Sequence, residues 1–119
     1  MSLVDTSREP LRPVVADDAA LRRTLDALEA AEGPVAFDVE RAHGYRYWPK
    51  AYLFQIRREG AGTWLIDPTK FDEARLARLV EVSGDAEWII HAASQDLPSM
   101  YEAGVVPPRI FDTELAARL

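Results

Sequence analysis

The sequence predicts an α/β fold, a mixed β-sheet with helices on both faces in the order α-βββ-α-β-α-β-α. Three observations lead to this prediction. Segments with apolar residues at helical spacing alternate with short β-type segments. The first three β-type segments follow one another through short links, which favours an antiparallel meander. A later one, Glu87 to His91, has the continuous apolar run that is typical of a strand buried on both faces.

Each helix is indicated by its spacing and its ends. Leucines at i, i+4 and i+7 predict a helix over 17–31, with acidic residues in its first turn and a Gly-Pro pair after it. Apolar residues on one helical face predict a second helix over 72–82. Ser94 is a favourable N-cap for a third helix that runs to Ala103, and a fourth is expected from Thr113 onward.

The predicted strands are short and are bounded by turn residues. A Gly-Ala-Gly turn at 60–62 joins two of them, and a loop at 41–50 contains glycine and proline. The expected strands cover 35–40, 52–57, 63–66, 87–91 and 109–111.

Length and composition limit the class of protein. The 119 residues are enough for one domain over 1–119 and too few for two separate cores. The chain has no cysteine, which excludes disulfide scaffolds, thiolate zinc sites and cysteine nucleophiles. No uninterrupted apolar run reaches the ~18 residues of a membrane span, and the N-terminus does not resemble a secretory signal. We therefore expect a cytoplasmic protein without membrane contact.

The net charge of −6 argues against a protein that binds nucleic acid along a broad basic surface. The stretch from Arg41 to Arg58 differs, since it combines five basic residues and several aromatic ones with no acidic residue. Such a mixture can neutralise phosphates and stack single-stranded bases, and Arg46, Tyr47 and Lys50 are its candidate binding residues. The alternative is a strand with a basic outer edge.

Three acidic residues form the candidate chemical site. Asp38 and Glu40 are at i and i+2 of one predicted strand, so both side chains point to the same face. Paired carboxylates of this kind suit Mg²⁺ or Mn²⁺, although a solvent-facing acidic pair is the alternative. Asp96 lies at a strand-to-helix junction, where α/β folds often place their sites. Its alternative is an acid favoured by the helix dipole.

Five segments in order resemble ribonuclease D, of the DEDD 3′–5′ exonuclease superfamily. They are FDVER at 37–41, YLFQIR at 52–57, LIDP at 65–68, HAASQDL at 91–97 and FDTELAA at 111–117. The resemblance implies a ribonuclease H-like fold and hydrolysis of phosphodiesters with two divalent cations, Mg²⁺ or Mn²⁺. Asp38 and Glu40 match the family's first motif, and Asp96 matches the second.

The resemblance also implies roles and a substrate. Asp38 would bridge both cations, Glu40 would bind the one that holds the attacking water, and Asp96 would hold the other. The expected substrate is single-stranded RNA, with DNA as the alternative. His91 would lie near the terminal nucleotide. The alternative for His91 is a polar end to a buried strand, hydrogen-bonded to a neighbouring loop.

The family's third motif, a tyrosine followed four residues later by an aspartate, has no match. After Asp96 the sequence has Tyr101 but no aspartate at that spacing. We therefore expect an exonuclease domain that is incomplete at its C-terminus, has little activity as this chain, and self-associates through an uncovered apolar face. The main alternative is a non-catalytic nucleic-acid-binding or scaffold domain of the same fold.

Overall fold

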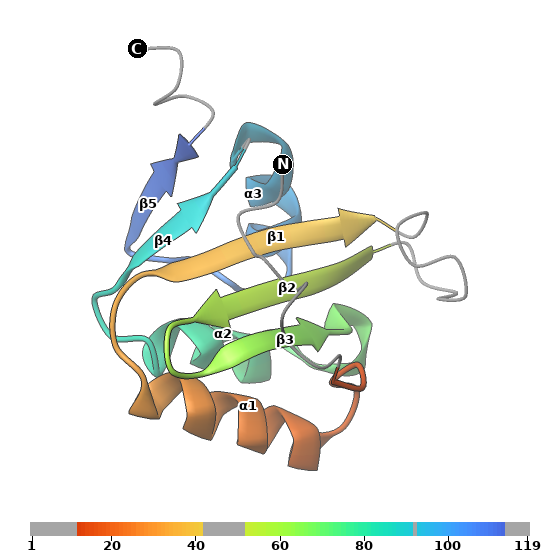
Figure 1. Cartoon of the computed structure of the whole chain (residues 1–119). Coiled ribbons are helices and arrows are strands. Elements are labelled where there is room, and N and C mark those ends of the chain that lie inside the picture. The colour runs from red at the N-terminus through yellow and green to blue at the C-terminus, as the bar shows by residue number, and fades with distance from the viewer. Residues whose placement is uncertain (1–11, 42–51, 92, 114–119) are drawn as a thin grey trace.

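The computed structural model of the chain describes residues 12–41, 52–91 and 93–113, which build a five-stranded sheet of order β3-β2-β1-β4-β5 (Figure 1). The elements are α1 (Asp18–Ala30), β1 (Val35–Arg41), β2 (Tyr52–Arg58), β3 (Gly62–Ile66), a short 3₁₀ helix (Pro68–Lys70), α2 (Glu73–Glu81), β4 (Glu87–Ile90), α3 (Ala93–Glu102) and β5 (Arg109–Asp112). The α/β class is confirmed. The fourth predicted helix lies almost entirely outside the described residues.

The sheet is mixed, as predicted. β1 and β2 pair antiparallel, as do β2 and β3, so the first three strands form the expected meander. β4 pairs parallel with β1 and also with β5, so β4 crosses over to the other side of β1. The carboxyl ends of β1, β4 and β5 therefore lie at the same edge of the sheet.

The helices α1 and α2 begin where an acidic side chain caps them. Asp17 accepts a hydrogen bond from the backbone N–H of Ala20 at 2.8 Å, and Asp72 accepts one from Arg75 N–H at 2.8 Å. Each cap satisfies a donor that the first helical turn leaves without a partner. Both helices start within a residue or two of the boundaries that the sequence predicts.

One apolar cluster joins the sheet to the helices. Phe37 of β1 is fully buried, and its ring lies 5.1 Å from that of Phe54 and 5.4 Å from that of Trp88, between ring centroids. Buried side chains of α1, α2 and α3 belong to the same cluster: Leu21, Leu25, Leu28, Leu76, Leu79 and Met100. Within the described part of the chain, the three α-helices thus pack against the sheet face that carries Phe37, and a helix on the other face stays a prediction.

Two features were not predicted. Asp67 caps the 3₁₀ helix by accepting hydrogen bonds from the backbone N–H and the hydroxyl of Thr69, at 2.9 and 2.6 Å. Val15 makes a parallel bridge to Ile66, and its N–H donates to the carbonyl oxygen of Leu65 at 2.7 Å.

Among the residues described, no helix combines the length and apolar character needed to cross a bilayer.

Candidate active site

Asp38 and Glu40 lie on the same face of β1, which confirms the spacing argument. Phe37 is buried in the core and Val39 packs against it. Because side chains alternate along a strand, Asp38 and Glu40 point to the opposite face, away from the three helices. Both side chains are half-buried. The two carboxylates are therefore held by a central strand with β2 on one side and β4 on the other.

The second predicted motif follows β4 at the same sheet edge. β1 and β4 are in parallel register, with Val35 opposite Trp88 and Ala36 opposite Ile89. β4 ends one residue later, and α3 then begins, with Asp96 in its first turn. The topology thus brings the start of α3 to the edge where β1 carries its acidic residues. How closely the carboxylates of Asp96 and Asp38 approach each other stays a prediction.

His91 directly follows β4, at the sheet edge where β1 carries Asp38. Its Nδ1 is 2.9 Å from the hydroxyl oxygen of Thr113, just after β5. The alternative for His91, a polar end to a buried strand with a hydrogen bond to a neighbouring segment, therefore agrees with the structure. A position near the terminal nucleotide stays a prediction.

Asp112 shares the edge but not the face. It pairs in register with Ile90, which is fully buried in the core. Residues paired across a ladder point to the same side of the sheet, so Asp112 points away from the face that carries Asp38 and Glu40. Asp112 therefore shares a sheet edge with Asp38 and Glu40 but lies on the opposite face of the sheet.

Sequence reasoning did not single out Gln55 as a site residue. Gln55 pairs in register with Asp38 and is 3% exposed. On β2, Phe54 and Ile56 face the core, so Gln55 lies on the acidic face beside Asp38. The available signal was an amide within the apolar run at 53–56.

The acidic face suits a divalent cation only in part. Asp38 and Glu40 supply the hard oxygen donors that Mg²⁺ and Mn²⁺ prefer. Within residues 12–41, 52–91 and 93–113, however, no three His, Asp or Glu side chains form a group that could hold a metal ion. The described residues thus present a pair of carboxylates rather than a complete cation site.

The basic stretch divides into two parts. Arg46, Tyr47 and Lys50 lie outside the described residues. The guanidinium of Arg58 is 8% exposed and donates to the carbonyl oxygens of Gly33 and Leu28, at 2.9 and 3.0 Å. Arg58 therefore belongs to the packing of the fold, because its side chain turns toward the core face and holds α1.

Comparison with known proteins agrees with this architecture. The chain matches the family described as 3′–5′ exonuclease over residues 13–119. It is 37% identical over 86 residues to ribonuclease D of Desulfotalea psychrophila, which covers 70% of this chain and 22% of that protein. The chain thus spans less than a quarter of the length of this curated relative.

Solved structures share the fold. A protein from Bifidobacterium adolescentis superposes with a TM-score of 0.78 and 41% identity, over 94% of this chain and 28% of that one. Escherichia coli RNase D, described as an exoribonuclease involved in structured RNA processing, superposes with a TM-score of 0.66 and 23% identity. That match covers 91% of this chain and 28% of RNase D, and it supports the fold alone.

Proposed function

Because the chain belongs to the 3′–5′ exonuclease family, as a ribonuclease D-like member of the DEDD group, we propose that it acts on single-stranded RNA from the 3′ end. The observation that carries the proposal is the placement of Asp38 and Glu40 on one face of β1, at the edge where β4 ends and α3 begins. Carboxylates at the carboxyl ends of strands are common in the sites of α/β enzymes.

We propose that Asp38, Glu40 and Asp96 bind Mg²⁺ or Mn²⁺ at this edge. A bound divalent cation would activate water and stabilise the charge that develops on the phosphate. Asp38, Glu40 and Asp96 would hold the cations. His91 would contact the terminal nucleotide. The parallel pairing of β1 and β4 supports these assignments, because the β4–α3 junction follows at the sheet edge where β1 carries its acidic residues.

RNA trimming with a blocked control tests this function. A 5′-labelled single-stranded RNA with a free 3′ hydroxyl is incubated with Mg²⁺, with Mn²⁺ or with a chelator, next to the same RNA carrying a 3′ phosphate and a DNA of the same sequence. We expect shortening from the 3′ end, only with metal, when the domain also carries the family's third motif. Equal trimming of DNA would make the protein an exonuclease without RNA preference.

The 119-residue chain itself is tested by binding. Its sequence after Asp96 has no tyrosine with an aspartate four residues later, so we expect RNA binding that depends on Mn²⁺ but little trimming. Robust trimming by this chain would contradict that expectation, and Tyr101 would then be the first residue to mutate.

A non-catalytic RNA-binding domain is the second candidate. The observation that favours it is the pair of carboxylates, without a third metal-binding group in the described part of the chain. RNA binding that is the same with metal and with chelator, and that survives Asp38→Asn, would support this candidate over the exonuclease.

A further inference from the structure

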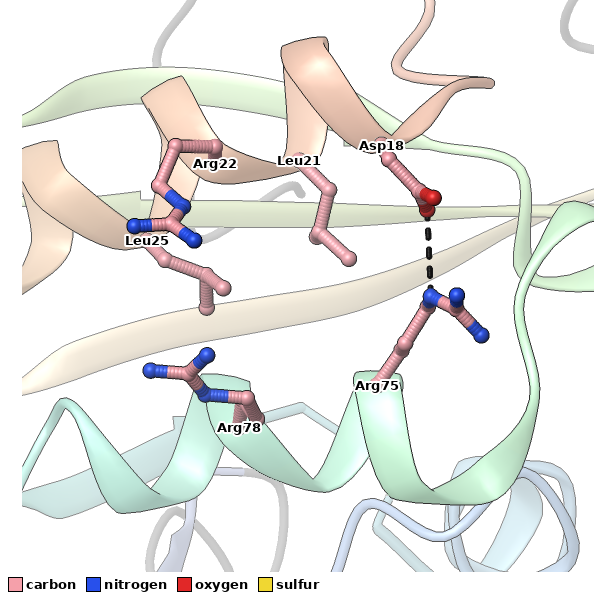
Figure 2. Close-up of a pocket in the computed structure, with 6 residues that line it drawn as sticks. All are labelled: Asp18, Leu21, Arg22, Leu25, Arg75 and Arg78. Atoms are coloured by element: carbon pink, nitrogen blue, oxygen red, sulfur yellow. Dashed lines mark ion pairs between the residues drawn. The ribbon is translucent and has the colours of Figure 1, made fainter.

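A groove between α1 and α2 lies on the other side of the molecule from the acidic edge. Its cavity is about 210 Å³, and it is lined by Asp18, Leu21, Arg22, Leu25, Arg75 and Arg78 (Figure 2). α1 and α2 pack on the sheet face that carries Phe37, whereas Asp38 and Glu40 point to the opposite face. The groove is therefore separate from the proposed nuclease site.

The two ends of the groove differ in charge. At one end Arg75 is neutralised, since its guanidinium lies 3.1 Å from Asp18 and 2.8 Å from Asp72. At the other end Arg22 of α1 and Arg78 of α2 point toward each other, with Leu25 between them in this view (Figure 2). No ion pair joins Arg22 to another residue of the described ranges, and Arg78 has only Glu81 at 3.9 Å.

Within the described residues, the only ion pair of these two guanidinium groups is therefore the long contact of Arg78 to Glu81. Two like charges across a narrow groove repel each other, and a long, solvent-exposed contact such as Arg78–Glu81 offsets little of that repulsion. A carboxylate or phosphate between them would remove the repulsion and accept paired hydrogen bonds from a planar guanidinium. The arrangement therefore favours an anionic ligand in a chain whose net charge is −6.

The rest of the groove selects among anions. Leu21 and Leu25, each 5% exposed or less, form an apolar floor that a phosphate cannot use. Asp18 lines the groove, and Asp72 and Glu81 pair with two of its arginines, so a polyanion such as RNA would meet these carboxylates as well as the arginines. A single carboxylate next to an aliphatic group avoids both the repulsion from these carboxylates and the placement of charge on the apolar floor. Its charge reaches Arg22 and Arg78, while its apolar part covers the leucines.

We propose that this groove is a docking site for a short acidic segment of a partner protein, with an acidic side chain between Arg22 and Arg78 and a neighbouring aliphatic side chain over Leu21 and Leu25. The cavity has the volume of a few side chains rather than of a folded domain. The site is thus suited to a peptide that lies across two helices, a mode in which charge gives selectivity and apolar contact adds affinity.

The test uses the 119-residue chain and defined probes. The Nε–H resonances of the arginines are followed by NMR while acetylated glutamyl-leucine amide is added, with acetylated glutaminyl-leucine amide as the uncharged control. We expect saturable shifts at Arg22 and Arg78 with a dissociation constant of about 1–10 mM for so small a probe, and none with the control. Arg22→Gln and Arg78→Gln should each weaken binding about tenfold.

Arg23→Gln is the matched variant. Arg23 is an exposed arginine one position further along α1, but it lines a different pocket beside Trp64. The Arg23→Gln variant should bind the charged probe as the unmodified chain does. Thermal melting of all three variants confirms that each is folded. Equal shifts with both probes, or equal losses in Arg22→Gln and Arg23→Gln, would overturn the proposal. So would shifts at Arg22 and Arg78 with single-stranded RNA and none with the peptide probe.

Discussion

The guanidinium of Arg58 donates a hydrogen bond to the carbonyl oxygen of Leu28 at 3.0 Å, across 30 residues of sequence. α1 has no basic residue in its last turn, so β2 supplies the positive charge that the carboxyl end of this helix favours. The same side chain donates to Gly33 O at 2.9 Å, which ties the turn after α1 to the sheet.

Replacing Arg58 should therefore destabilise the fold. We expect Arg58→Met to lower the free energy of unfolding by about 1–3 kcal/mol, because carbonyl oxygens near the core lose a charged donor. Arg57→Met is the control, since Arg57 is more exposed and its contacts to Thr63 and Glu59 are long, at 3.3 and 3.8 Å. It should cost about 0–1 kcal/mol. Urea denaturation measures both, and equal losses would contradict the assigned role of Arg58.

Gly104 should be intolerant of a side chain for two separable reasons. Its φ is +95°, and a Cβ there would lie 2.9 Å from the carbonyl oxygen of Glu73 at the start of α2. Gly84 has φ +62° with no atom within 4 Å of such a Cβ. We expect Gly84→Ala to cost about 1 kcal/mol from backbone strain alone, and Gly104→Ala clearly more. Thermal unfolding compares the two, and similar costs would mean that α2 shifts without difficulty.

The sequence predicted those parts of the fold and site that depend on local pattern. Alternation alone placed Asp38 and Glu40 on one face, and leucine spacing alone predicted the buried side of α1. Strand pairing is not encoded locally, so the sequence could not reveal that Gln55 lies opposite Asp38. Nor could composition distinguish Arg58, which turns toward the core face, from its basic neighbours.

The face of each acidic residue predicts its effect on metal binding. Asp38→Asn should abolish Mn²⁺-dependent RNA binding, because it removes a ligand from the acidic pair. Asp112→Asn changes the same group at the same sheet edge, but on the face of Ile90, and should leave that binding nearly unchanged. Fluorescence anisotropy with a labelled single-stranded RNA measures both variants. Loss in Asp112→Asn without loss of folded structure would place the cation on the other face.

The basic stretch before β2 should contribute through phosphate contacts. Reversing the charge of Arg46 and Lys50 together should weaken single-stranded RNA binding and flatten its dependence on salt. Each lost phosphate contact should reduce the slope of log affinity against log salt by about 0.7. A titration over several salt concentrations gives both quantities. If affinity and slope are unchanged, the two residues serve only to solvate the surface.

Self-association through an uncovered apolar face at the C-terminus is the last expectation, and β5 is the last strand of the described chain. Within the described residues β5 pairs with β4 alone, so its other side is unpaired there. Phe111 on this strand is 44% exposed, and an apolar residue on an unpaired edge favours pairing with a second copy.

We expect sedimentation equilibrium to show concentration-dependent association that Phe111→Lys suppresses, since an edge lysine opposes strand addition. Tyr101→Lys is the control, because Tyr101 is 46% exposed but lies on α3 rather than on the strand edge. Association that persists in Phe111→Lys and disappears in Tyr101→Lys would assign the contact to the helix instead.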